Sequence, residues 1–263
     1  MVSYRARMSS ASESGAVYAR LRRQAAFATS TTVLGTVVTA AALGLAVGLA
    51  GIELAGFVGR AVLVPAILAV IALPSLSLHR LGTLGTANAV TLFRSALIGA
   101  CAAFIGYDGA EAYVWPLFFA TGAAFVLDWL DGRLARAAGQ ATPFGARLDM
   151  ELDAITVLVL CALVWHLDRA GAWVFWSGAL RYLFVAAAAV WPWMNRELYP
   201  TNRRRFTCGV QVTCLIWALP PYPGLPGFGD GFAAAVAAFG LVTLVLSFGM
   251  DTFWLWQRRA EPL

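Results

Sequence analysis

The sequence has little charge and, among its basic residues, no lysine at all. Only 13% of its 263 residues are charged, whereas 60% are hydrophobic. A soluble domain usually carries about 25% charged residues, so this composition argues against an ordinary soluble protein. The formal net charge is +5, and every basic residue is an arginine. These arginines stand beside hydrophobic runs, which favours a membrane surface over nucleic acid as their partner.

The sequence also lacks the pattern of a disulfide framework or a zinc site. It contains two histidines and four cysteines, and no pair of cysteines has metal-ligand spacing. All four cysteines lie in or beside apolar segments, so they are predicted to be buried and inert. They are Cys101, Cys161, Cys208 and Cys214. A cleavable signal peptide is not indicated, because a polar, Arg-rich segment precedes the first apolar run, which is long enough to span.

Several apolar runs reach the roughly 20 residues that a helix needs to cross a bilayer. We therefore predict an all-α, polytopic membrane helix bundle of about eight spans. The spans are expected at about residues 29–50, 60–77, 88–106, 113–136, 144–167, 173–193, 206–220 and 232–256. A basic tail, 1–28, precedes them, and a short tail, 258–263, follows. Eight spans place both tails and the arginine-rich loops on one side, which the positive-inside rule assigns to the cytoplasm.

Four aspartates are concentrated in one stretch, DWLDGRLARAAGQATPFGARLDMELD, at residues 128–153. Asp128 and Asp131 are three residues apart on one predicted helix. Asp149 and Asp153 are four apart on the next, so each pair shares a helical face. A short turn joins the two helices, and the pairs should face each other across it. Carboxylates this close repel unless they are protonated or bind cations, and oxygen ligands suit Mg²⁺ or Mn²⁺ better than zinc.

Small and basic residues accompany the aspartates. Gly132 costs a helix about 1 kcal/mol relative to alanine, and close approach of a ligand to the backbone would explain it. Ala135 and Gly145 each lie about one helical turn from an aspartate and leave space beside it. Arg136 can counter the charge of a phosphate. Together these residues indicate a phosphate-containing ligand.

This stretch resembles the signature of the CDP-alcohol phosphatidyltransferase family, D-x2-D-G-x2-A-R-x8-G-x3-D-x3-D. Every fixed position of that signature is filled and every gap is kept. The resemblance extends more loosely over residues 85–257, where the six-helix core of the family would lie. Residues 29–80 then form two additional N-terminal spans.

The resemblance implies the reaction and its site. A CDP-linked lipid, typically CDP-diacylglycerol, would donate its phosphatidyl group to an alcohol with release of CMP, in phospholipid biosynthesis. Two divalent cations, Mg²⁺ or Mn²⁺, would be held by Asp128, Asp131, Asp149 and Asp153. Asp153 would also act as the general base on the acceptor hydroxyl. The CDP pocket would be lined by Gly132, Ala135, Arg136 and Gly145.

Two further expectations follow from the resemblance. The protein would be a homodimer, and it would lie in a bacterial inner or plasma membrane. The positive-inside rule places its active site and both termini at the cytoplasmic face.

Polar residues also recur where the third span begins. Asn88, Thr91 and Arg94 are spaced three residues apart and lie close to one helical face. They are either interfacial capping and snorkelling residues or a polar wall of the site. In the second case Asn88 and Thr91 would contribute to CDP binding.

The acceptor is less well indicated. Arg181 lies deep in a span, where an arginine is costly unless it is paired or faces a polar cavity. The cluster Arg203–Arg205 is either a topology signal that contacts anionic lipid or part of an anion pocket with Arg181. Such a pocket would fit a phosphorylated acceptor such as glycerol 3-phosphate or inositol phosphate. The candidate acceptor-binding residues are Arg94, Arg181, Arg203, Arg204 and Arg205.

Two other classes of function stay open at this point. The carboxylate cluster could belong to a cation transporter, although transporter acids do not require this spacing of glycine, alanine and arginine. A non-catalytic membrane scaffold is the other alternative, against which the complete set of aspartates argues.

Overall fold

The structure is a computed structural model of the whole chain. It describes residues 54–78, 86–137, 143–196, 198–199, 201–222 and 231–259, together with the single positions 19 and 35. Nearly all of the predicted tail at 1–28 and of the predicted first span at 29–50 lie outside these residues.

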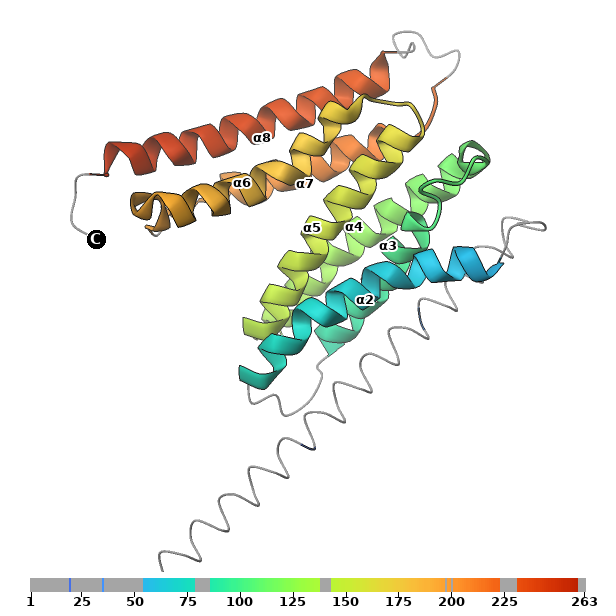
Figure 1. Ribbon diagram of the computed structural model, residues 1–263, viewed down its shortest axis with the longest axis horizontal. Coiled ribbons are helices and arrows are strands. Elements are labelled where there is room, and N and C mark those ends of the chain that lie inside the picture. The colour runs from blue at the N-terminus through green and yellow to red at the C-terminus, as the bar shows by residue number, and fades with distance from the viewer. Residues whose placement is uncertain are drawn as a thin grey trace, which may run out of the picture. The chain divides into compact units, whose positions relative to one another are not determined.

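The described residues form seven α-helices and no strand (Figure 1). The α-helices are α2 (Leu54–Leu78), α3 (Thr86–Ala102), α4 (Val114–Ala137), α5 (Pro143–His166), α6 (Trp176–Val190), α7 (Arg203–Trp217) and α8 (Phe232–Gln257). Three short 3-10 helices accompany them: η1 (Ala110–Tyr113), η2 (Ala172–Phe175) and η3 (Pro192–Asn195). The predicted all-α fold is therefore confirmed.

The outer surfaces of these helices are suited to lipid. Three described segments, Ala110–Trp129, Ala172–Val190 and Phe232–Gln257, are long and apolar enough to cross a membrane. Large apolar side chains cover them, and Phe119, for example, is 66% exposed. Apolar surface on this scale is rare on soluble monomers and matches a lipid environment, where helices satisfy their own backbone hydrogen bonds. The protein is a polytopic membrane helix bundle, as predicted.

Two helices begin earlier than the hydropathy pattern predicts. Helix α2 begins at Leu54 rather than near Arg60, whose Nε lies 3.4 Å from the carbonyl oxygen of Gly56 inside the helix. Helix α7 begins at Arg203 rather than near residue 206. The Thr201 hydroxyl accepts a hydrogen bond from the Arg203 backbone N–H at 3.2 Å, and this satisfies one of the N–H groups left over at a helix start. Both helices therefore include charged residues that hydropathy alone would place outside them.

The predicted sixth span, residues 173–193, is not one continuous helix, because the helix is interrupted close to its C-terminal end. Helix α6 stops at Val190, because Trp191 is extended and Pro192 follows it. Proline disfavours a helical conformation in the preceding residue and cannot donate the backbone hydrogen bond that a helix needs. The chain then forms the short helix η3 before α7.

Contacts divide the chain into two compact units. Unit 1 comprises Met1–Ala103 and Val126–Leu152, and unit 2 comprises Phe104–Phe125 and Asp153–Leu263. The divisions fall within α4 and α5, so each of these continuous helices contributes residues to both units.

In unit 1, helix α2 packs closely against α3 (Figure 1). Gly99 of α3 makes this close approach possible: a Cβ atom there would clash with the carbonyl oxygen of Ala61 and lie 3.1 Å from Cδ of Pro65. Phe57 and Leu68 of α2 are almost wholly buried. The packing therefore holds α3, which carries Arg94, against a helix that ends fifty residues before Asp128, the first of the aspartates.

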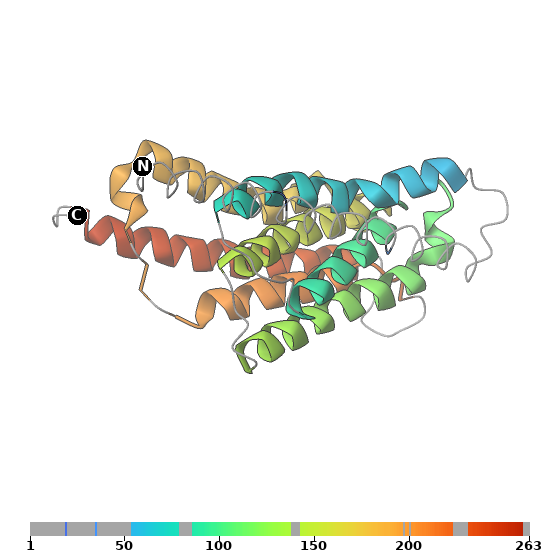
Figure 2. The same cartoon turned by 90° about the horizontal axis from the view of Figure 1, so that it is seen from below.

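In unit 2, helices α7 and α8 pack along each other (Figure 2). Gly240 of α8 faces Gln211 and Cys214 of α7, where an added Cβ would lie 2.7 Å from Gln211 Oε1. The Gln211 side chain, which is 1% exposed, donates from Nε2 to the Ser177 hydroxyl of α6 at 2.8 Å. A buried hydrogen bond of this kind joins α6 to the α7–α8 pair.

We expect Gly99→Ala to destabilise the protein, because the added methyl group would meet a backbone carbonyl that cannot move aside. Overpacking typically lowers the free energy of unfolding by about 1–3 kcal/mol, and this should exceed the gain in helix propensity of up to about 1 kcal/mol. Gly122→Ala in α4 is the matched control, since nothing lies within 4 Å of its added Cβ. Thermal unfolding in detergent should show a lower midpoint for Gly99→Ala only. Equal midpoints would contradict the close contact between α2 and α3.

Candidate active site

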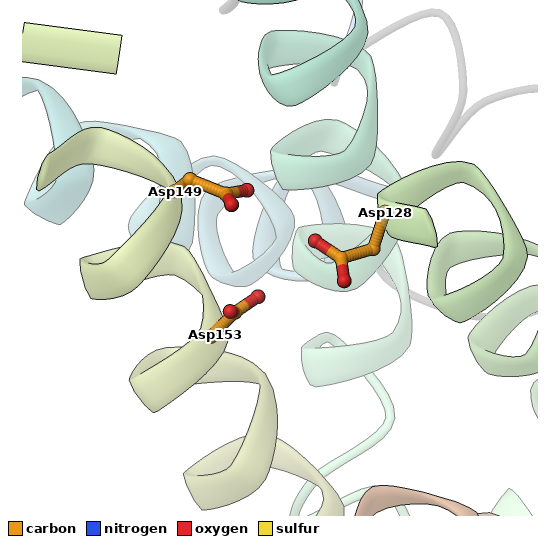
Figure 3. Close-up of side chains that lie close together, drawn as sticks. All are labelled: Asp128, Asp149 and Asp153. Atoms are coloured by element: carbon orange, nitrogen blue, oxygen red, sulfur yellow. The ribbon is translucent and has the colours of Figure 1, made fainter. Parts of the chain in front are cut away.

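Three of the four signature aspartates converge. Asp128, Asp149 and Asp153 each offer a carboxylate oxygen, and these oxygens lie within 4.8 Å of one another. Asp128 comes from α4, and the other two come from successive turns of α5 (Figure 3). Figure 3 shows the three carboxyl groups pointing toward one another. The spacing of i and i+4 on α5 thus presents both of its aspartates on the side that faces Asp128.

The donor set fits a hard divalent cation. All three groups supply oxygen, the ligand that Mg²⁺ and Mn²⁺ prefer, and their separation allows them to share one ion. The carboxyl side chains of Asp128 and Asp149 are 28% and 37% exposed, so an ion can reach them from solution. Asp131 lies on α4 one turn after Asp128, and its side chain falls outside the described residues.

Arg94 of α3 is the partner that holds two of these aspartates. Its Nη1 lies 2.6 Å from Oδ1 of Asp128 and 2.7 Å from Oδ1 of Asp149. One nitrogen thereby bridges a carboxylate of α4 and a carboxylate of α5. The three residues all belong to unit 1. The sequence left two alternatives for Arg94, an interfacial snorkelling residue or part of a polar wall of the site, and the structure shows that its guanidinium is directed at the aspartates.

The pairing explains how an arginine is accommodated inside an apolar helix. The Arg94 side chain is only 4% exposed, and moving such a charge out of water costs several kcal/mol unless partners compensate for it. Two carboxylates at hydrogen-bonding distance provide this compensation. Because the two carboxylates are more exposed than the Arg94 guanidinium, the guanidinium lies on their inner side.

The residues predicted for the CDP pocket lie on the same helices as the aspartates. Asn88 and Thr91 are on α3, and the Thr91 side chain is buried one turn before Ser95. The remaining predicted pocket residues are Gly132, Ala135 and Arg136 on α4 and Gly145 on α5. Asn88 and these four residues have side chains outside the described ones, so their role stays a prediction.

Two of the predicted acceptor arginines are paired with an acidic residue that the sequence analysis missed. Asp251 of α8 forms an ion pair with Nη2 of Arg203, and Nε of Arg204 lies 3.5 Å from its other oxygen. Arg204 also donates to the backbone carbonyl of Tyr199. Arg205, the third member of the cluster, is exposed. The carboxylate of Asp251 on α8 therefore neutralises part of the positive charge of the cluster.

A signal for Asp251 was present in the sequence. It is a single carboxylate within an apolar segment of 26 residues, and ionisable groups in such segments are usually paired and functional. Asp251 is 8% exposed, in keeping with a paired group. Sequence spacing did not reveal its partners, because 46 residues or more separate it from the arginines.

Arg181 of α6 and Asp153 of α5 both lie near Cys208 of α7. The charges of both residues act on the thiol of Cys208 on α7. Cys208 is exposed, contrary to the prediction of four buried cysteines. Cys101, Cys161 and Cys214 are buried, as predicted.

Apolar helices of spanning length, together with an acidic centre around a buried arginine, are the features of an integral membrane protein with a charged site inside its helix bundle. Residues 84–248, more than half of the chain, match the CDP-alcohol phosphatidyltransferase family, and the chain belongs to that family. Members transfer a phosphatidyl group from a CDP-alcohol to an alcohol. The protein is accordingly a transferase of substituted phosphate groups. No curated protein and no solved structure matches the chain.

We expect Asp251→Ala to destabilise unit 2. The substitution leaves two half-buried guanidinium groups without their carboxylate, and losing a hydrogen bond to a charged group costs about 1.5–3 kcal/mol. Thermal unfolding of Asp251→Ala, Arg203→Gln and the double variant should show strong coupling between the two sites. Thr252→Ala is the control, since its hydroxyl only donates back to the Phe248 carbonyl at 2.9 Å. Additive effects of the two substitutions would rule out the ion pair.

Proposed function

We propose that this protein transfers the phosphatidyl group of CDP-diacylglycerol to an alcohol, with release of CMP, in phospholipid biosynthesis. The observation that carries the proposal is the convergence of Asp128, Asp149 and Asp153 at the family signature. A lipid donor with a pyrophosphate group suits an acidic, cation-binding centre inside a bundle of apolar helices. Its pyrophosphate requires cations, and its acyl chains require an apolar environment.

In this proposal the four signature aspartates hold two divalent cations, Mg²⁺ or Mn²⁺. Asp128, Asp149 and Asp153 provide a converging oxygen set, and Asp131 adds a fourth carboxylate from the next turn of α4. When bound, the cations supply charge neutralisation and alignment for the donor pyrophosphate. The six residues Asn88, Thr91, Gly132, Ala135, Arg136 and Gly145 bind the CDP part of the donor.

Asp153 acts as the general base. Its side chain is the most exposed of the three converging aspartates, and it lies one turn beyond Asp149 toward the C-terminal part of α5. The hydroxyl oxygen of the acceptor attacks the phosphorus of the phosphatidyl group while its proton moves to the Asp153 carboxylate. The bond between that phosphorus and the oxygen of CMP breaks, and CMP leaves with the electron pair.

The acceptor is a phosphorylated alcohol, such as glycerol 3-phosphate or inositol phosphate. The support is that the charges of Arg181 and Asp153 both act on the Cys208 thiol, so each lies in the vicinity of that side chain. Arg203 and Arg204 share Asp251, so their charge available to an anion is reduced. Arg205 completes the set of proposed acceptor-binding arginines, whereas Arg94, the remaining candidate from the sequence, has its guanidinium against Asp128 and Asp149.

We further propose that the enzyme is a homodimer in a bacterial plasma membrane, with the site and both termini on the cytoplasmic side. The distribution of arginine supports the orientation. Exposed apolar side chains on the spanning helices, such as Phe239 of α8, offer surface for a second copy or for lipid.

The decisive experiment combines the purified full chain, CDP-diacylglycerol, Mg²⁺ or Mn²⁺ and a panel of alcohols. CMP release is expected with a phosphorylated alcohol and is expected to stop when the divalent cation is chelated. Turnover with serine or an amino alcohol alone would overturn the acceptor class. The absence of turnover with every acceptor, together with cation flux in vesicles, would overturn the proposed function.

Asp153→Asn should reduce CMP release by about 10²–10⁴-fold, the usual contribution of a general base, because the amide cannot accept the proton. The variant should keep the melting temperature of the wild type. Glu151→Gln is the matched control, since Glu151 lies on α5 but off the face of Asp149 and Asp153. Near-normal turnover by Asp153→Asn would remove the base assignment.

Arg181→Gln should raise the KM for a phosphorylated acceptor by about 10–100-fold, which corresponds to a lost charge-assisted hydrogen bond. The kcat should change much less. Arg169→Gln serves as the control, because Arg169 pairs with Glu111 at 2.8 Å and belongs to no proposed site. An unchanged KM in Arg181→Gln would place the acceptor phosphate elsewhere.

A further inference from the structure

The position of the Arg94 charge has a consequence for cation binding. Its Nη1 lies within hydrogen-bonding distance of one oxygen of Asp128 and one oxygen of Asp149, on the inner side of both carboxylates. We infer that Arg94 is a built-in counter-ion, which a divalent cation must displace and which thereby sets the affinity of the site for that cation. The inference rests on the proposed metal site and assigns Arg94 a positioning role in it.

The first step of the argument is electrostatic. Three ionised carboxylates whose oxygens lie within 4.8 Å of one another repel strongly. A guanidinium group removes part of this repulsion, and arginine keeps its proton at any physiological pH. Arg94 therefore holds the ends of α4 and α5 together when no divalent cation is bound. Removing its charge should leave a more negative centre that is less stable without a cation and attracts a cation more strongly.

The second step is steric. Divalent Mg²⁺ or Mn²⁺ binds oxygen at about 2.0–2.2 Å. Nη1 of Arg94 already lies 2.6 Å from Oδ1 of Asp128 and 2.7 Å from Oδ1 of Asp149, so an ion held by these two oxygens would meet the guanidinium group. The positively charged guanidinium of Arg94 and the divalent ion would also repel each other at such a short distance. The guanidinium must leave at least one of these two oxygens before an ion can bind both of them.

These two steps give Arg94 opposite effects on stability and on affinity. It stabilises the cation-free protein, and it competes with the cation for the same oxygens. Linkage makes these two effects equal: Arg94 weakens the binding of the ion by the same free energy by which the bound ion weakens the interaction of Arg94 with the aspartates. A purely structural arginine would behave differently, because its removal would distort the site and weaken cation binding.

The test measures Mn²⁺ binding to the detergent-solubilised full chain by electron paramagnetic resonance, with no substrate present. Arg94→Gln should bind Mn²⁺ about tenfold more tightly or better than the wild type, as expected for removal of a like charge a few Å away. Its melting temperature without Mn²⁺ should be lower than that of the wild type, and Mn²⁺ should restore more of it. Arg94→Lys should keep an affinity close to that of the wild type, because the positive charge is retained. Arg169→Gln is the control for loss of an arginine elsewhere.

The outcomes separate this inference from the proposed function. Mn²⁺ binding by the wild type with equal or weaker binding by Arg94→Gln overturns the counter-ion role and leaves the metal site standing. The absence of Mn²⁺ binding by the wild type and by Arg94→Gln overturns the metal site itself. If Arg94→Gln does not fold, an experimental structure of the wild type with Mn²⁺ decides: Nη1 should have left at least one carboxylate. A guanidinium that still bridges Asp128 and Asp149 beside bound Mn²⁺ overturns the inference.

Discussion

Arg94 carries a permanent positive charge in a part of the protein where water contributes almost nothing to its solvation. Its guanidinium is stabilised by Asp128 and Asp149, and in return it reduces the repulsion between them. This interaction connects α3, α4 and α5, so the helices that carry the family signature share one charged centre. The close packing of α2 against α3 at Gly99 also helps to hold α3, and with it Arg94, in place. An acidic centre with several like charges can thus exist inside a lipid-facing bundle.

Unit 2 follows the same physical rule with the signs reversed. Here the minority charge is Asp251, and the arginines at the start of α7 surround it. Positive side chains in the first turn of a helix are opposed by the helix dipole, and the carboxylate of α8 offsets that cost. Both units therefore bury one ion among partners of the opposite sign. They differ in access, because the carboxylates around Arg94 are exposed enough to bind a further ligand, whereas Asp251 is enclosed.

Much of the fold could be predicted from the sequence, because in a membrane the constraint on each segment is local. Apolar runs of spanning length become helices whatever their neighbours are, and the ends of α3, α5 and α8 lie within a few residues of the hydropathy boundaries. The largest difference is at the start of α2, which begins at Leu54 and therefore takes Arg60 inside the helix. The Arg60 side chain lies close to the Gly56 carbonyl oxygen of its own helix, and hydropathy does not report local contacts of this kind.

The sequence by itself determined the chemical content of the candidate site: the aspartates, their helical faces and the family signature all follow from spacing along the chain. Only the tertiary structure decided which opposite charges meet, because ion pairs such as Arg94 with Asp149 and Arg203 with Asp251 join residues 55 and 48 positions apart. Spacing places side chains on a helix face, but the choice of partner depends on how helices pack. For this reason the sequence proposed Arg94, Arg203 and Arg204 as ligands for an acceptor, and the structure shows carboxylates as their immediate partners.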